Sequence, residues 1–297
     1  MKEILIIAHP LPNSNIPSSL RVNGYQLSNY INKITPSKCL CLNIDEISSL
    51  ENKNIIFLGS LITGLKLNQD ILTKLKKQNN TIILNPIDDL CYKSDKQLQE
   101  EVDVFDNIDG VVFPNEFVKD YFKDTYNKSN QSTVLPHPYD DTFNKMDINQ
   151  SRPFKVSYVG SSYENFILSN PPSWLTLDQT GNVNSIFQLL VDSPVHFSHR
   201  ESNTIDFYFK PSSKLSVASS CNSPMIMSKD KSFIDLLPDY PLYVNDSIDD
   251  VNEKYELAKS WYGTDKWNEL LDLMNEIKYK TSLDTISKQY INYLNNF

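Results

Sequence analysis

Short apolar runs separated by helix-length segments are the feature that most constrains the fold of this chain. Residues 54–60 and 81–87 are almost uninterrupted apolar runs, and residues 68–78 between them have a helical pattern. Runs without polar alternation are typical of parallel strands, because the helices that connect such strands cover both faces of the sheet. The order strand, helix, strand therefore predicts an α/β fold with parallel sheets.

The same pattern fills the first half of the chain and then stops. A strand is predicted at residues 1–8, a helix at 20–34, strands at 38–44, 110–114 and 133–136, and a helix at 115–126. A polar loop without periodicity follows at residues 140–153. Since the length of 297 residues suits two medium domains, we place the domain boundary in this loop, giving domains of residues 1–145 and 146–297.

The pattern restarts at residue 154 with an apolar strand that ends in the turn Gly160-Ser161. Residues 165–180 are predicted to be irregular, and a helix at 182–191, strands at 194–197, 225–227 and 241–244, and a helical tail follow. Glycine lets the backbone approach a phosphate or a sugar closely, so Gly160 and Ser161 are candidates for ligand contact. A glycine needed only for the turn explains Gly160 equally well.

Three cations follow the strand at residues 194–197. Arg200 lies three residues after its end, and Lys210 and Lys214 lie four residues apart in the segment that leads to the next strand. Ligands bind at the carboxyl edge of open parallel sheets. Arginine offers a planar fork and lysine a point charge, and both suit a diphosphate.

The residues around these cations resemble a known family. They are Arg200, Lys210-Pro211-Ser212-Ser213-Lys214-Leu215, Ala218 and Pro224-Met225-Ile226. The run is similar to the donor-binding region of GT-B glycosyltransferases, with a donor domain of the glycosyltransferase family 1 type. The E-x7-E pair of the commonest retaining members is absent, and Ser223 stands where a glycine is usual. These departures leave the sugar and the stereochemical course open.

The resemblance implies two Rossmann-like domains whose parallel sheets face a central cleft, with a C-terminal helical tail that crosses back to the N-terminal domain. It implies that the C-terminal domain binds a UDP- or GDP-linked sugar as substrate. It also implies that the N-terminal domain binds the acceptor, which is a glycan, a lipid-linked molecule or another acceptor, as in polysaccharide biosynthesis. The donor-binding residues would be Gly160, Ser161, Arg200, Lys210, Ser213 and Lys214.

Two residues of the first half are candidates for catalysis. The run Pro17-Ser18-Ser19-Leu20-Arg21 is similar to the first loop of the same enzymes, which faces the cleft, and His9 lies at the tip of the strand before it. Asp88 follows the strand at 81–87 and could act as a base. Simpler interpretations stay open, because His9 could merely cap the strand end and the Asp88-Asp89 pair could begin a turn or cap a helix.

Composition and missing motifs exclude several classes. A net charge of −9 opposes a broad nucleic-acid-binding face, so nucleic acid is not an expected partner. Neither GxGxxG nor GxxxxGK[ST] occurs, and no DxD element or His/Cys cluster indicates a metal, so we expect no cofactor and no metal. No run approaches the roughly 20 apolar residues of a membrane span, so a cytoplasmic location is expected. Lipid-linked acceptors leave peripheral membrane contact open, and the oligomeric state is not indicated.

Three functions remain to be weighed. The first is a metal-independent glycosyltransferase, in which the three cations stabilise the leaving nucleotide. The second is a phage-type enzyme that glucosylates DNA bases, which the net charge opposes. The third is a non-catalytic protein that binds nucleotide sugars or carbohydrates on a GT-B scaffold, since fold does not fix function.

Overall fold

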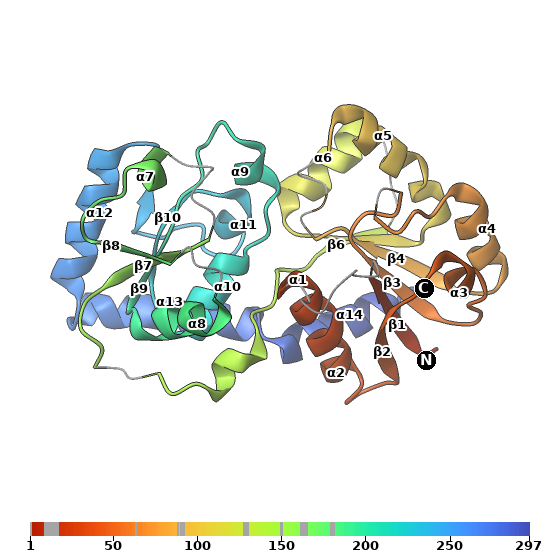
Figure 1. The fold of residues 1–297 in the computed structure, drawn as a ribbon, viewed down its shortest axis with the longest axis horizontal. Coiled ribbons are helices and arrows are strands. Elements are labelled where there is room, and N and C mark those ends of the chain that lie inside the picture. Colours follow the sequence, from red (N-terminus) through yellow and green to blue (C-terminus); the bar gives the residue numbers. More distant parts are fainter. Residues whose placement is uncertain are drawn as a thin grey trace. The chain divides into compact units, whose positions relative to one another are not determined.

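The computed structural model describes residues 2–8, 18–62, 64–87, 89, 93–126, 131–148, 151–160, 166–178 and 182–297. Its contacts divide the chain into two compact units (Figure 1). The first unit comprises Met1–Pro138, Phe209–Pro211 and Ser282–Phe297, and the second comprises Tyr139–Tyr208 and Ser212–Thr281. The chain therefore changes unit at 138/139, 208/209, 211/212 and 281/282, whereas the sequence suggested a single boundary between 145 and 146.

A parallel sheet forms the centre of the first unit, with the strand order β2-β1-β3-β4-β5-β6. The strands are β1 (Ile4–Ala8), β2 (Ser37–Cys41), β3 (Asn54–Leu58), β4 (Thr81–Asn85), β5 (Gly110–Phe113) and β6 (Gln131–Val134). The strand predicted at 38–44 is too long. It ends at Cys41 because Asn43 caps the next helix, where its side chain accepts hydrogen bonds from the Asp45 and Glu46 amides.

Helices and helical turns of the first unit flank this sheet. They are α1 (Ser18–Leu20), the π-helix η1 (Arg21–Gln26), α2 (Leu27–Ile31), α3 (Ile44–Ser48), α4 (Gln69–Lys77), α5 (Asp95–Asp103), η3 (Phe105–Asn107), α6 (Glu116–Tyr126) and α14 (Leu283–Leu294). The helix predicted at 20–34 thus ends three residues early and contains a π-helical segment, a form that is frequent at functional sites.

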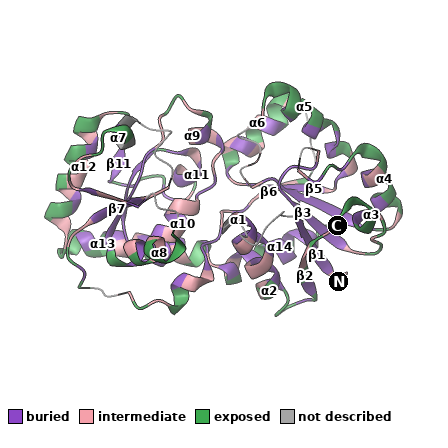
Figure 2. Ribbon diagram, viewed as in Figure 1, coloured by how far each residue is buried: buried purple, intermediate pink, exposed green. Residues whose placement is uncertain are grey.

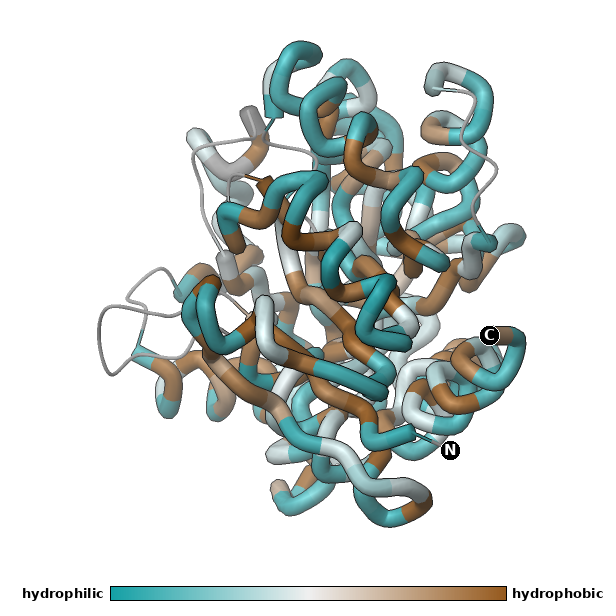
Figure 3. Tube along the Cα trace, turned by 90° about the vertical axis from the view of Figure 1, so that its right-hand side faces the viewer, coloured by the Kyte–Doolittle hydropathy of each residue, from teal (hydrophilic) through white to brown (hydrophobic). Residues whose placement is uncertain are grey.

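The strands of the first sheet are buried on both faces, as the apolar runs predict. Ile4 and Ile6 of β1 share a core cluster with Ile286 and Tyr290 of α14, whereas Leu5, which points to the opposite face, is buried as well. Figure 2 shows buried residues along the strands and exposed ones on the outer sides of the helices. Apolar colour likewise follows the strands in Figure 3, while the helices alternate between apolar and polar residues.

A second parallel sheet, with the order β11-β10-β9-β7-β8, forms the centre of the second unit. Its strands are β7 (Val156–Val159), β8 (Leu175–Asp178), β9 (Val195–Ser198), β10 (Met225–Ser228) and β11 (Tyr243–Val244). The prediction that residues 165–180 are irregular is wrong, since this stretch contains a helix and the strand β8. β8 is an edge strand with only half-buried central residues, so it lacks the continuous apolar run by which the other strands are found.

Helices and helical turns surround the sheet of the second unit. They are η4 (Asp141–Lys145), α7 (Phe166–Ser169), α8 (Val183–Asp192), α9 (Ile205–Phe209), α10 (Ser213–Ser220), α11 (Lys231–Ile234), α12 (Ile248–Trp261) and α13 (Asp265–Lys280). The last residue of α9, Phe209, is grouped with the first unit, where its ring packs against those of Phe117 and Tyr121. In the described part of the chain, no helix combines the length and the apolar composition needed to cross a bilayer.

A buried histidine makes the stability of the second unit depend on pH. Burial lowers the pKa of His196 to about 4, and its Nε2 lies 2.9 Å from the Leu190 carbonyl oxygen, to which it donates. The unfolded chain takes up this proton near pH 6.5, so the stabilisation is complete above that value and is lost as the pH falls toward 4. We expect a loss of about 2 kcal/mol from this group at pH 5 relative to pH 7.

Tryptophan fluorescence reports the unfolding of the second unit. The three tryptophans of the chain, Trp174, Trp261 and Trp267, all lie in that unit. Urea unfolding would be followed at pH 7 and pH 5 in the wild type and in His196→Gln. The variant should lose less stability between the two values, and an identical loss would contradict the assignment to His196.

Candidate functional site

The second sheet reverses its strand order at β7. The chain leaves β7 for β8 on one side and returns as β9 on the other, so β7 lies between β8 and β9. At such a switch point the connections leave in opposite directions and open a crevice at the carboxyl ends of the strands. Gly160 directly follows β7, and Arg200 follows β9 by two residues. Both residues therefore lie at the edge where a ligand of this sheet is expected.

Gly160 and Lys214 lie close together at this edge. The φ angle of Gly160 is +142°, a conformation that side chains disfavour. A Cβ on Gly160 would lie 2.9 Å from the Tyr158 hydroxyl and 3.3 Å from the Lys214 ammonium nitrogen, which itself lies 4.0 Å from the centre of the Tyr158 ring. The absence of a side chain at Gly160 thus leaves room for the Lys214 ammonium group over the Tyr158 ring.

The amino end of α10 adds donors beside Lys214. The helix begins at Ser213, and its first turn contains no acidic residue. The cap residue Ser212 is buried, and no described residue forms a hydrogen bond with its hydroxyl. The first N–H groups of a helix lack partners within the helix and carry its positive dipole end, which favours an anion.

Arg200 has an acidic partner that the sequence did not reveal. Its Nη1 forms an ion pair with Oδ2 of the buried Asp230, while Asp230 Oδ1 accepts a hydrogen bond of 2.5 Å from Ser228. Burial raises the pKa of the Asp230 carboxyl, and the Arg200 guanidinium opposes that rise. One N–H of the fork is therefore engaged, and the guanidinium retains further donors for an anion.

His199 stands between β9 and Arg200 and is also buried. Its Nε2 lies 3.1 Å from Asp246 Oδ1, at the end of β11. Burial lowers the pKa of His199, and the Asp246 carboxylate acts in the opposite direction. Asp246 is fixed by Ser202, whose amide nitrogen lies 2.9 Å from Oδ2. Two sets of polar side chains thus follow the carboxyl ends of β9, β10 and β11. Arg200, Asp230 and Ser228 form one, and His199, Asp246 and Ser202 form the other.

The other residues predicted to form the site are not part of this edge of the second sheet as described. Lys210 is grouped with the first unit, next to Phe209, whereas Gly160, Arg200, Ser213 and Lys214 are grouped with the second. Its part in donor binding stays a prediction. His9, Asp88 and Ser161 lie outside the described residues. No cluster of three or more His, Cys, Asp or Glu side chains that could hold a metal ion occurs within the described ranges.

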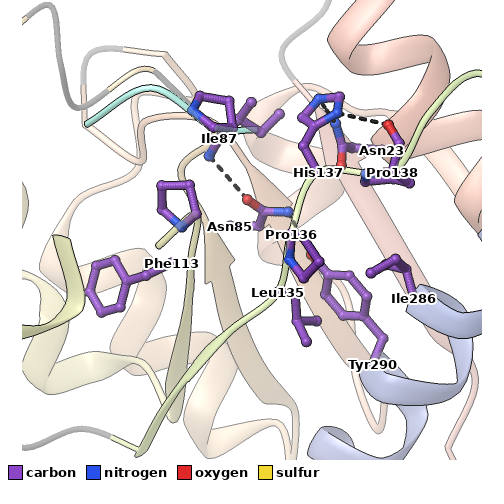
Figure 4. Close-up of a pocket in the computed structure, with 12 residues that line it drawn as sticks. Asn23, Asn85, Ile87, Phe113, Leu135, Pro136, His137, Pro138, Ile286 and Tyr290 are labelled. Atoms are coloured by element: carbon purple, nitrogen blue, oxygen red, sulfur yellow. Dashed lines mark hydrogen bonds between the residues drawn. The ribbon is translucent and has the colours of Figure 1, made fainter. Parts of the chain in front are cut away.

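A second concave site lies in the first unit, at the carboxyl ends of β4, β5 and β6 (Figure 4). Its polar residues are Asn23, Asn85, His137 and Tyr290. The sequence does not indicate this site, because its lining residues are far apart in the chain, from Asn23 to Tyr290. Asn85 offered the one local signal, since it is a polar residue that ends an otherwise apolar strand.

Neither a protein-family profile nor a curated protein sequence matches the chain. Solved structures, in contrast, are similar over its whole length. The HepE protein of Anabaena, crystallised with UDP and glucose, has a TM-score of 0.66 at 9% identity, with 100% of both chains covered. A glycosyltransferase from Rickettsia africae ESF-5 has a TM-score of 0.65 at 10% identity, again with 100% of both chains covered.

A third similar structure is the N-terminal domain of a Candida albicans trehalose-6-phosphate phosphatase. Its TM-score is 0.62 at 14% identity, and 99% of this chain and 97% of that chain are covered. At these identities the likeness concerns the arrangement of the two sheets and their helices.

Proposed function

We propose that this chain, which has the GT-B fold predicted from its sequence, is a glycosyltransferase that moves a sugar from a nucleotide-sugar donor to an acceptor without a bound metal ion. The observation that carries the proposal is the position of Lys214 beside Gly160, at the amino end of α10 and the switch point of the second sheet. The acceptor belongs to the glycan or lipid-linked class, as in polysaccharide biosynthesis.

The chemistry of transfer explains why cations are needed there. The bond between the sugar C1 and the diphosphate oxygen breaks, and the diphosphate leaves with the electron pair. The acceptor oxygen bonds to C1 and releases its proton. Lys214, Arg200 and the first N–H groups of α10 are suited to stabilise the negative charge that develops on the leaving group. Cationic side chains can contact phosphate oxygens without an ion between them.

The similar structures support a uridine nucleotide as the first donor to test. HepE was crystallised with UDP-glucose and with UDP and glucose. An inverting reaction needs a base near the acceptor, and His9 and Asp88 stay the proposed candidates for that role. A retaining reaction does not need this base, and the stereochemical course is left open.

Turnover with a panel of UDP- and GDP-linked sugars tests the proposal. Donor hydrolysis and transfer would be measured before chelator treatment, after it, and after magnesium or manganese is added back. Activity should persist in the chelator. Loss with the chelator and recovery with the ion would refute the metal-free site, and nucleotide binding without any turnover would favour a non-catalytic binding protein.

Lys214→Ala should weaken nucleoside-diphosphate binding by about 1.5–3 kcal/mol, which is roughly 10- to 150-fold in affinity, because a hydrogen bond to a charged group is lost. Calorimetry with UDP and GDP would measure the effect. Lys266→Ala is a matched control in the same unit, since Lys266 is exposed and pairs with Glu269 on α13. Equal affinities of the Lys214 variant and the wild type would remove Lys214 from the site.

A further inference from the structure

Lys214 has an unfavourable position for a cation within its own helix. α10 begins at Ser213, so Lys214 lies in the first turn, which contains no acidic residue. The amino end of a helix carries the positive end of the helix dipole, and a positively charged side chain is destabilising there. The position of Lys214 therefore costs stability unless another group attracts its ammonium.

The ring of Tyr158 supplies such an attraction. The Lys214 ammonium nitrogen lies over this ring, 4.0 Å from its centre. The face of an aromatic ring is electrically negative and attracts a cation within about 6 Å. Tyr158 is buried, with 4% of its surface exposed, and the attraction is stronger where water is excluded.

Tyr158 is itself held firmly by the second sheet. It lies in β7 and pairs with Leu177 of the neighbouring strand β8. Its ring belongs to the core of the second unit and packs against the ring of Phe197, with 6.5 Å between the ring centres. Side chains in a close-packed core keep one rotamer, so the ring face offers a fixed surface to Lys214.

Gly160 keeps the space above the ring open. A Cβ at this position would lie 2.9 Å from the Tyr158 hydroxyl oxygen and 3.3 Å from the Lys214 ammonium nitrogen. Both distances are shorter than ordinary van der Waals contacts of a carbon atom, so a side chain at Gly160 would displace the ammonium group. Tyr158, Gly160 and Lys214 together form what we call the lysine seat.

An aromatic ring holds a cation in a different way from a carboxylate. Asp230 forms an ion pair with Arg200 and thereby offsets part of the charge of its guanidinium. The Tyr158 ring has no net charge, so it restrains the Lys214 ammonium without offsetting its charge. A lysine side chain loses much rotamer freedom when it binds an anion, and a side chain that is already restrained loses less.

We propose that Tyr158 is a positioning residue, whose ring holds the Lys214 ammonium where it binds the diphosphate of the donor. Gly160 takes part by leaving the space that this arrangement needs. The role in donor binding rests on the proposed function. The contact between the ring and the ammonium group does not, and it can be tested without a nucleotide.

NMR of the full-length protein with ¹³C-labelled lysine tests the contact. Protons above the face of an aromatic ring resonate upfield, so the Cε protons of Lys214 should be shifted upfield from those of exposed lysines. The Lys214 signal is assigned by its absence from the spectrum of Lys214→Gln. Tyr158→Phe should keep the upfield shift because it keeps the ring, and Tyr158→Leu should abolish it.

Calorimetry with UDP and GDP tests the positioning role. Tyr158→Leu should weaken binding about 3- to 10-fold, whereas Tyr158→Phe, the matched control, should bind as the wild type does. In the Lys214→Ala background, Tyr158→Leu should cause no further loss, because the ring acts through the lysine. A purely structural role of Tyr158 would lower the affinity in both backgrounds.

Urea unfolding followed by tryptophan fluorescence shows whether each variant is folded. If Tyr158→Leu does not fold, the contact is still tested by the wild-type spectrum and by Gly160→Ala. This variant leaves the Tyr158 ring in place but adds the Cβ that meets the ammonium nitrogen. Its Lys214 signal should therefore lose part of the upfield shift.

Several outcomes would overturn the inference. They are a Lys214 signal without an upfield shift in the wild type, an unchanged shift in Tyr158→Leu, and an equal loss of affinity from Tyr158→Leu with and without Lys214. The proposed function fails separately. If the Lys214 signal is shifted but the protein binds neither UDP nor GDP, the contact stands and the donor-site assignment falls.

Discussion

Replacement of Glu101 by alanine is expected to lower the free energy of unfolding of the first unit by about 3–5 kcal/mol, the usual cost of removing one member of a buried ion pair. The Glu101 carboxylate is fully buried and accepts hydrogen bonds from the Ser60 hydroxyl and from the amides of Leu61 and Ile62, at 3.0 and 3.1 Å. Lys93 Nζ lies 3.7 Å from Glu101 Oε1, and the Lys93 side chain is 8% exposed. Alanine would leave the two amides and the ammonium group without this acceptor.

Urea unfolding followed by far-UV circular dichroism would measure the loss, and tryptophan fluorescence should stay unchanged because it reports the second unit. Glu100→Ala is the matched control, since Glu100 is an exposed neighbour on α5 that pairs with the exposed Lys96. Its effect should stay within about 0.5 kcal/mol, as for most surface substitutions. Similar losses in the two variants would contradict a special role of the buried carboxylate.

Arg152→Ala should destabilise the second unit by about 3–5 kcal/mol, because several buried carbonyl oxygens would each lose a partner at about 1–3 kcal/mol. Arg152 is buried, and burial lowers the pKa of its guanidinium. Its fork joins the carboxyl ends of α8 and α10 through the oxygens of Val191, Ser193, Cys221, Asn222 and Ser223, at distances of 2.7, 3.2, 3.3, 3.2 and 3.3 Å.

The loss would be measured by urea unfolding with tryptophan fluorescence. Arg152→Lys should lose an intermediate amount, since lysine keeps the charge but cannot reproduce the fork. Lys155→Ala, three residues further along the same segment, should have little effect. A fluorescence transition of Arg152→Ala that coincides with the wild type would show that the helix ends do not depend on this residue.

The sheets could be predicted from the sequence wherever strands are buried on both faces. The runs that became β3 and β4 are fully buried, and such strands are apolar along their whole length. The edge strand β8 could not be found in this way, because its middle residues are only half-buried. The GT-B fold followed from the donor-region resemblance and is confirmed by the similar structures.

The candidate sites could be predicted only in part. Gly160 could be placed at the carboxyl edge of the sheet because it directly follows a strand. Lys214 could be placed there because it lies at the start of the helix that connects two strands. The pairing of Arg200 with Asp230 could not, since it depends on β9 and β10 lying side by side. The contact between Asn85 and Tyr290 joins residues 205 positions apart, and no local pattern in a sequence reports such a distance.

The return of α14 to the first unit bears on how the protein is made. α14 contributes Ile286 and Tyr290 to the core that covers β1, yet the whole of the second unit, within residues 139–281, comes before it in the sequence. A ribosome adds residues in order and domains generally fold as they emerge. The second unit can therefore fold first, while the N-terminal part of the nascent chain still exposes one apolar face of its sheet. Chaperones bind exposed apolar surfaces of this kind.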